Sequence, residues 1–187
     1  MSASRVRRPR TAPVLRVGVT AATLAASILL LSGCSGDPAA VAYGRAQSVR
    51  VTDERTKTDA TVAVTVTGVD VAPADALDGV DLDAEERALT PYFVQFRAKL
   101  ADGDYSSDFQ TPFYDAWSGA DATGATLAPL SVFGSLRSCP AFGADEAKAL
   151  AKGEEVAACQ ILLGEKGGVR ELTLLEHWRW TPPAKKS

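Results

Sequence analysis

The chain has few of the residues and motifs from which enzyme active sites are built. It holds one histidine, His177, among 187 residues, and no G-x-S-x-G nucleophile elbow. A Ser–His–Asp triad would depend on His177 alone, without the turn that presents its serine. The glycines of Gly164–Gly168 are not followed by Lys-Ser or Lys-Thr, so they predict a turn rather than a phosphate-binding loop. These absences predict a protein that is not an enzyme and has no cofactor.

Long apolar runs are also scarce, and the one that is present lies near the N-terminus. Residues 1–16 contain five arginines and no acidic residue, and the 15 residues Val17–Leu31 are apolar or weakly polar. As a helix this run spans about 22 Å, less than the roughly 30 Å of a bilayer's hydrocarbon core. A basic segment followed by a short apolar one predicts a secretory signal peptide rather than a membrane span.

The apolar run ends in Leu31-Ser32-Gly33-Cys34, which resembles the lipobox of bacterial lipoprotein signal peptides. The resemblance implies cleavage of residues 1–33, a diacylglyceryl group on the Cys34 thiol and acylation of the new amino terminus. Two or more fatty-acyl chains, such as palmitate, give stable membrane anchoring. The mature protein is therefore expected on the outer face of the cytoplasmic membrane, lipid-anchored at Cys34. A secreted protein with an unmodified Cys34 is the alternative.

The charge of the mature chain differs from that of the whole. Cleavage at this site leaves 154 residues with 23 acidic and 15 basic side chains, a formal charge of −8. That length is typical of one domain. The acidic balance argues against nucleic acid as a partner and against a domain lying flat on anionic lipid. We expect one solvated domain that is held away from the bilayer.

The remaining cysteines form an even pair, Cys139 and Cys159. Disulfides persist outside the membrane, so this pair predicts a Cys139–Cys159 bridge, with two free thiols as the alternative. Together with His177 the two cysteines fall short of the four ligands of a structural zinc site, and no C-x-x-C is present. We therefore expect no metal site among these residues.

Alternating apolar and polar residues dominate the chain after residue 45 and predict β-strands. The expected strands are 61–71, 91–100, a strand with Phe109, Phe113 and Trp117 on one face, 126–133, 155–163 and 169–180. Gly68, where the alternation changes phase, predicts a β-bulge. Asp102-Gly103 predicts a hairpin turn. Residues 81–89 and 145–152 favour short helices.

The order of these segments, with the run LAKGEEVAAC from Leu150 to Cys159 before a late strand, is similar to a known family. It resembles the telokin-like, immunoglobulin-like domain of many Gram-positive, especially actinobacterial, lipoproteins. The resemblance implies an all-β, immunoglobulin-like β-sandwich of about seven strands over residues 46–180, with short helical excursions. Residues 34–45 are then a lipidated tether and 181–187 a disordered tail. The family implies an extracellular setting and supplies no catalytic residues.

An acidic insertion at residues 75–86 does not align with this family. It contains acids at the alternate spacing of a calcium loop, namely Asp81, Asp83 and Glu85. The required glycine is replaced by Glu86, and the twelfth position is Tyr92 instead of glutamate. The residues favour a solvated acidic loop, and weak divalent-ion binding at 75–86 stays open.

A few aromatic residues are weak candidates for a ligand-binding surface. Trp117, Trp178 and Trp180 could stack on sugars or peptides, with His177 beside them, although aromatic residues on strands more often belong to a core. His177 is expected on a sheet face, next to Glu176 or Arg179. The sequence thus predicts a non-enzymatic interaction or accessory module of the cell envelope, with another envelope protein as partner. The alternative is a ligand-binding module for cell-wall glycan, peptide or a small solute.

Overall fold

The computed structural model describes residues 39–52, 57–73, 75–106, 111–132 and 136–183. The expected signal peptide, residues 34–38 of the tether with Cys34, and residues 184–187 of the tail lie outside these ranges, as does Phe109. Within the described ranges, no helix has the length and apolar character needed to cross a membrane.

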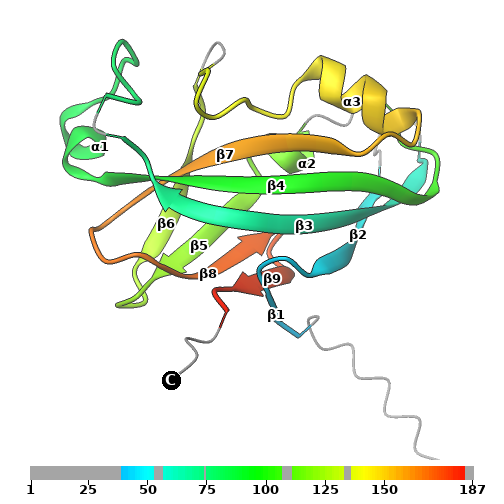
Figure 1. Ribbon diagram of the computed structural model, residues 1–187, viewed down its shortest axis with the longest axis horizontal. Helices are drawn as coiled ribbons and strands as arrows, with labels where there is room; N and C mark the ends of the chain where they lie inside the picture. Colours follow the sequence, from blue (N-terminus) through cyan, green and yellow to red (C-terminus); the bar gives the residue numbers. More distant parts are fainter. Residues whose placement is uncertain (1–38, 53–56, 74, 107–110, 133–135, 184–187) are drawn as a thin grey trace, which may run out of the picture. The chain divides into compact units, whose positions relative to one another are not determined.

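About half of the described residues lie in one mixed sheet of nine strands, so the predicted β-rich class is confirmed (Figure 1). The strand order is β1-β9-β8-β5-β6-β7-β4-β3-β2, and only β1 and β9 pair in parallel. The strands are β1 (Val41–Ala42), β2 (Ala46–Thr52), β3 (Asp59–Val71), β4 (Thr90–Gly103), β5 (Trp117–Asp121), β6 (Thr126–Leu130), β7 (Val156–Gly164), β8 (Val169–Leu174) and β9 (Trp178–Thr181).

The two ends of the sheet, β1 and β2, are consecutive in the chain, and this brings the sheet nearly to a closed barrel. Across the seam the Gln47 side-chain amide donates to the Arg179 carbonyl at 2.5 Å. The Trp180 indole N–H donates to the Arg45 carbonyl at 3.1 Å. The immunoglobulin-like sandwich is not confirmed, because β6 pairs with both β5 and β7 and so joins all strands into one continuous sheet.

The inner face of the sheet carries the larger of two apolar clusters, here called the interior cluster. Alternation places Val62, Val64 and Val66 of β3 inside, each fully buried. Large side chains fill the centre: Phe96, Phe113, Trp117, Phe142, Leu162, Leu172 and Trp180 are almost completely buried. The Trp117 and Trp180 rings lie 5.8 Å apart, so this space is packed by side chains.

A second apolar cluster, the outer cluster, covers the opposite face of β4 and β7. Its buried members are Ala72, Phe93, Leu130, Cys139, Cys159, Ile161 and Leu163. The segments that cover it come from residues 76–89 and 130–139, and Leu77, Leu82 and Leu89 are only half-buried there. Strand β7 is therefore buried on both faces over most of its length.

One strand prediction is confirmed in detail, and two others are wrong. β3 contains the expected bulge, seen as a register shift between Val66 and Gly68. The predicted turn at Asp102-Gly103 is wrong, because Gly103 pairs with Ala60 and β4 continues through it. The expected strand through Phe113 is also wrong, since this residue lies in helix α2 (Thr111–Tyr114).

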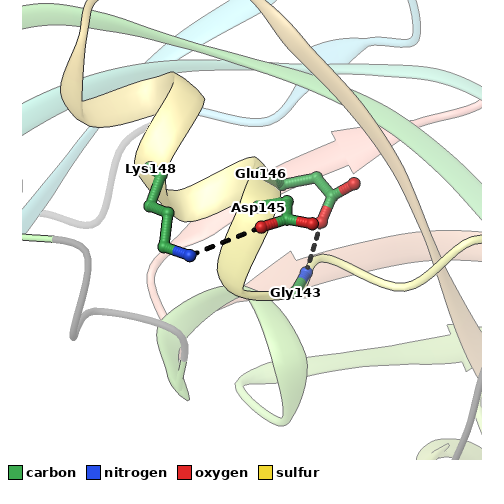
Figure 2. Close-up of polar contacts among 4 residues, drawn as sticks. All are labelled: Gly143, Asp145, Glu146 and Lys148. Carbon is green, nitrogen blue, oxygen red and sulfur yellow. Dashed lines mark hydrogen bonds and ion pairs between the residues drawn. The ribbon is translucent and has the colours of Figure 1, made fainter.

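The two expected short helices are present as α1 (Ala84–Ala88) and α3 (Ala144–Ala151). In α1 the Glu86 N–H donates to the Asp83 carboxylate at 2.8 Å, and the Asp83 N–H donates to Glu86 at 2.9 Å. This reciprocal capping box satisfies two backbone donors that the first turn leaves free. At the start of α3 the Gly143 N–H donates to Glu146 at 3.0 Å (Figure 2).

Candidate functional site

A hollow lies between the 72–82 loop and α1, beside the outer cluster. We call it the loop cavity, and its volume is about 440 Å³. Its walls are Ala72, Pro73, Leu77, Asp78, Gly79, Val80, Leu82, Glu86, Arg87, Leu89 and Pro91. A volume of this size is within the range of small-ligand sites, about 300–1,000 Å³.

Local backbone hydrogen bonds give the loop its shape. At its base the Ala72 N–H donates to the Pro91 carbonyl at 2.9 Å, so the loop leaves and rejoins the sheet at one place. Within it the Val80 N–H donates to the Leu77 carbonyl at 3.0 Å, and Gly79 takes a φ of 86°, which suits glycine. Leu77 and Leu82 pack on the outer cluster, so these two apolar residues hold the otherwise polar 72–82 loop against the sheet.

The segment around the cavity is acidic, whereas the walls themselves carry two acids, Asp78 and Glu86, and one base, Arg87. Residues 72–91 contain one base, Arg87, and six acids: Asp75, Asp78, Asp81, Asp83, Glu85 and Glu86. Asp83 and Glu86 are engaged in the capping box of α1. Within the described ranges, no group of three or more His, Cys, Asp or Glu side chains is placed to hold a metal ion. The arrangement suits a ligand that combines an apolar group with positive charge.

The tryptophans named from the sequence do not line this cavity. Trp117 and Trp180 lie in the interior cluster with 1% and 0% exposure, so neither presents a ring to solvent. Trp178 is half-buried and packs against the same cluster. These positions give an aromatic stacking surface little support.

His177 lies at the β8–β9 turn and not on a sheet face, so that prediction is wrong. The turn places Leu175 and Glu176 at φ values of 51° and 62°, and the His177 N–H donates to the Leu174 carbonyl at 3.3 Å. Two consecutive positive φ values match a type I′ hairpin turn. His177 is exposed, and its ring meets Trp178 edge-on at 5.9 Å.

Two smaller hollows lie elsewhere on the surface. A groove of about 300 Å³ is lined by Tyr43, Val69, Val71, Tyr92, Gly168, Val169, Pro182 and Pro183. Burial raises the pKa of Tyr43 to about 12. The Tyr92 hydroxyl accepts from the Gly168 N–H at 3.1 Å and donates to the Glu165 carbonyl at 2.7 Å. These bonds fix the β7–β8 turn beside the groove.

The predicted Cys139–Cys159 disulfide is confirmed, with its Cα atoms 5.0 Å apart. It ties the 136–140 segment to β7, and the Cys159 N–H also donates to the Pro140 carbonyl at 2.8 Å. A cleft of about 260 Å³ lies beside this segment, with Thr67, Gln95 and Arg97 among its walls. Arg97 pairs there with Glu155 at 3.4 Å, an exposed contact that contributes little to stability.

Sequence reasoning marked residues 75–86 as acidic but did not foresee a cavity. The signal that points to it is the set of apolar residues among the acids, Leu77, Val80 and Leu82, which a fully solvated loop would not need. No protein-family model, curated protein or solved structure matches the chain. The similarity to telokin-like domains therefore stays a prediction.

Proposed function

We propose that the protein is a lipid-anchored interaction module of the cell envelope, held at the outer face of the cytoplasmic membrane through Cys34. The support for the anchor is the basic segment, the short apolar run and the lipobox-like residues Leu31–Cys34. The support for a binding role is the loop cavity, together with the lack of a nucleophile elbow or phosphate-binding loop in the sequence.

The position of the cavity relative to β1 fits such a role. Six residues separate Cys34 from Val41, and the seven extended steps between these two residues reach at most about 25 Å. The linker would thus keep the start of β1 within this distance of the lipidated residue. Figure 1 shows α1 at the far side of the barrel from β1, so a chain that joins Cys34 to β1 leaves the α1 side of the domain free for a partner.

Binding of a small solute, wall glycan or peptide is the second candidate function. The observation that favours it is the volume of the loop cavity, which falls within the small-ligand range. For a glycan the support is weaker, because Trp117 and Trp180 are buried and no tryptophan, tyrosine or phenylalanine lines the loop cavity.

Membrane fractionation and in-cell crosslinking of the full-length protein test the proposal. We expect the protein in the membrane fraction with one dominant crosslinked envelope protein, and both features lost in Cys34→Ala, which lacks the acceptor sulfur. A Cys34→Ala protein that fractionates unchanged would overturn the anchor. An anchored protein without any crosslinked partner would shift the weight to solute binding.

A further inference from the structure

We propose that the loop cavity binds a basic segment of a partner protein, in which an apolar side chain enters the cavity and flanking lysines or arginines meet the acidic loop. This inference rests on the proposed interaction function and assigns the partner's chemistry. Three features carry it: the apolar walls of the cavity, the concentration of negative charge around it, and the way that charge extends beyond it.

The walls of the cavity can accept an apolar side chain. Leu77, Val80, Leu82 and Leu89 line it, and each stays half-buried rather than buried. Val80 is half-buried but does not pack against the outer cluster, so its exposed apolar surface makes no contact with that cluster. Covering such surface is favourable by about 25 cal/mol per Å². An apolar group of the partner supplies that cover.

The negative charge around the cavity is concentrated, and it includes three aspartates whose side chains make no polar contact within the described ranges. Residues 72–91 carry a formal charge of −5 out of −8 for the chain after residue 33. Asp75, Asp78 and Asp81 are exposed, and the structure gives their side chains no hydrogen bond or ion pair within the described ranges. Complementary charge on a partner would increase the association rate and oppose acidic competitors.

The layout of these acids favours a segment of chain over a compact molecule. Asp78 lines the cavity, whereas Asp75 and Asp81 precede and follow the wall formed by Leu77–Val80. Neither Asp75 nor Asp81 is among the lining residues, so a ligand must extend beyond the cavity to meet these two carboxylates. An extended peptide with a central apolar residue and flanking cations has that form, whereas a small amine has a single cation beside its apolar part.

Binding to a matched set of labelled peptides tests this inference with the full-length protein in nonionic detergent. Each probe has a central leucine pair flanked by lysines, by glutamates or by serines, and fluorescence anisotropy gives its Kd. We expect binding of the lysine peptide only, weakened by about tenfold or more when the salt concentration rises from about 0.05 to 0.5 M. Replacing the central leucines by serines should abolish it.

Two variants of the protein and their matched controls locate the binding. Val80→Ser removes apolar wall, and Asp78→Asn/Asp81→Asn removes two charges that have no hydrogen bond within the described ranges. Each should raise the Kd for the lysine peptide by about tenfold. The matched controls are Val71→Ser, in the groove, and the double variant Asp102→Asn/Asp104→Asn, at the end of β4. Both controls should leave this Kd unchanged. Equal binding of all peptides, no binding of the lysine peptide, or equal effects of variants and controls would overturn the inference.

A competition arm separates the possible occupants. If 4-phenylbutylamine displaces the lysine peptide at concentrations near the peptide's own Kd, the cavity takes a compact amine and the partner-segment inference fails. The interaction function is tested separately in cells. A Cys34-dependent crosslinked partner without lysine-peptide binding would overturn only the chemistry proposed here. Lysine-peptide binding without any such partner would overturn the interaction function instead.

Discussion

Strand β7 has apolar clusters on both faces, and the two differ in how completely they are filled. On the inner face, Leu162 is fully buried among large side chains of several strands. On the outer face, its neighbour Leu163 packs beneath half-buried leucines of a loop that leaves a cavity of about 440 Å³. The comparison indicates that the inner face is filled by the fold itself, whereas the outer face leaves part of its apolar surface uncovered.

The sharpest test of this comparison is to truncate two adjacent leucine side chains, one on each face of β7, to alanine. Leu162→Ala should lower the free energy of unfolding by about 4 kcal/mol, because the interior cluster is enclosed by strands and cannot collapse into the space. Leu163→Ala should cost about 2 kcal/mol, because the loop above it can move inward. Denaturant unfolding of both variants measures this difference. Equal losses would show that the outer cluster is as rigid as the inner one.

Removal of the disulfide should break the outer cluster while sparing the inner one. The Cys139–Cys159 bridge closes a loop of 20 residues, so Cys139→Ala/Cys159→Ala should cost about 3 kcal/mol in the chain-entropy model. We expect faster amide exchange in residues 136–142. Exchange in β3, which lies on the other side of β4, should change no more than the global loss of stability requires. A selective loss of protection in β3 would contradict the separation of the two clusters.

Loss of the α1 cap should act on the loop cavity alone. Asp83→Ala removes the carboxylate that accepts from the Glu86 N–H, at a cost of about 1 kcal/mol. Amides of residues 84–89 should exchange faster, and Asp81→Ala is the control, since the Asp81 side chain is exposed and has no hydrogen bond among the described residues. Equal exchange in the two variants would mean that the leucines, and not the cap, hold α1 in place.

The sequence predicted the elements better than their arrangement. The alternation of β3, the bulge at Gly68, the two short helices and the disulfide are local signals, and all are confirmed. The continuous sheet depends on β6 pairing with both neighbours, which no local pattern encodes. Long-range pairing also explains the error at Asp102-Gly103, because pairing with β3 outweighs the turn preference of these two residues.

The functional candidates show the same limit. The β8–β9 turn has Leu175 and Glu176 where such turns favour glycine or asparagine, so His177 could not be placed from sequence. Leu175 packs against the interior cluster, and this contact favours the strained turn. For the loop cavity, acidic residues were visible in the sequence, but the enclosure by α1 follows from tertiary packing of Leu77, Leu82 and Leu89.

The smallest expected effect is on the pH dependence of stability, and it comes from the hairpin of β5 and β6. This hairpin belongs to the barrel and not to the outer cluster. The hydrogen bond from the Thr123 hydroxyl, at 2.7 Å, lowers the pKa of Asp121, and the Ala125 and Thr123 N–H groups add to it. A carboxyl whose pKa is lower in the folded state stabilises the protein above its unfolded pKa of about 3.9. That contribution disappears as the pH falls through the folded pKa.

The stability difference between the native protein and Asp121→Asn should therefore be largest near pH 7 and shrink on acidification, as measured by urea unfolding at several pH values. A difference independent of pH would mean that Asp121 acts through hydrogen-bond geometry alone. Protonation of Asp121 would then not contribute to acid destabilisation of the barrel.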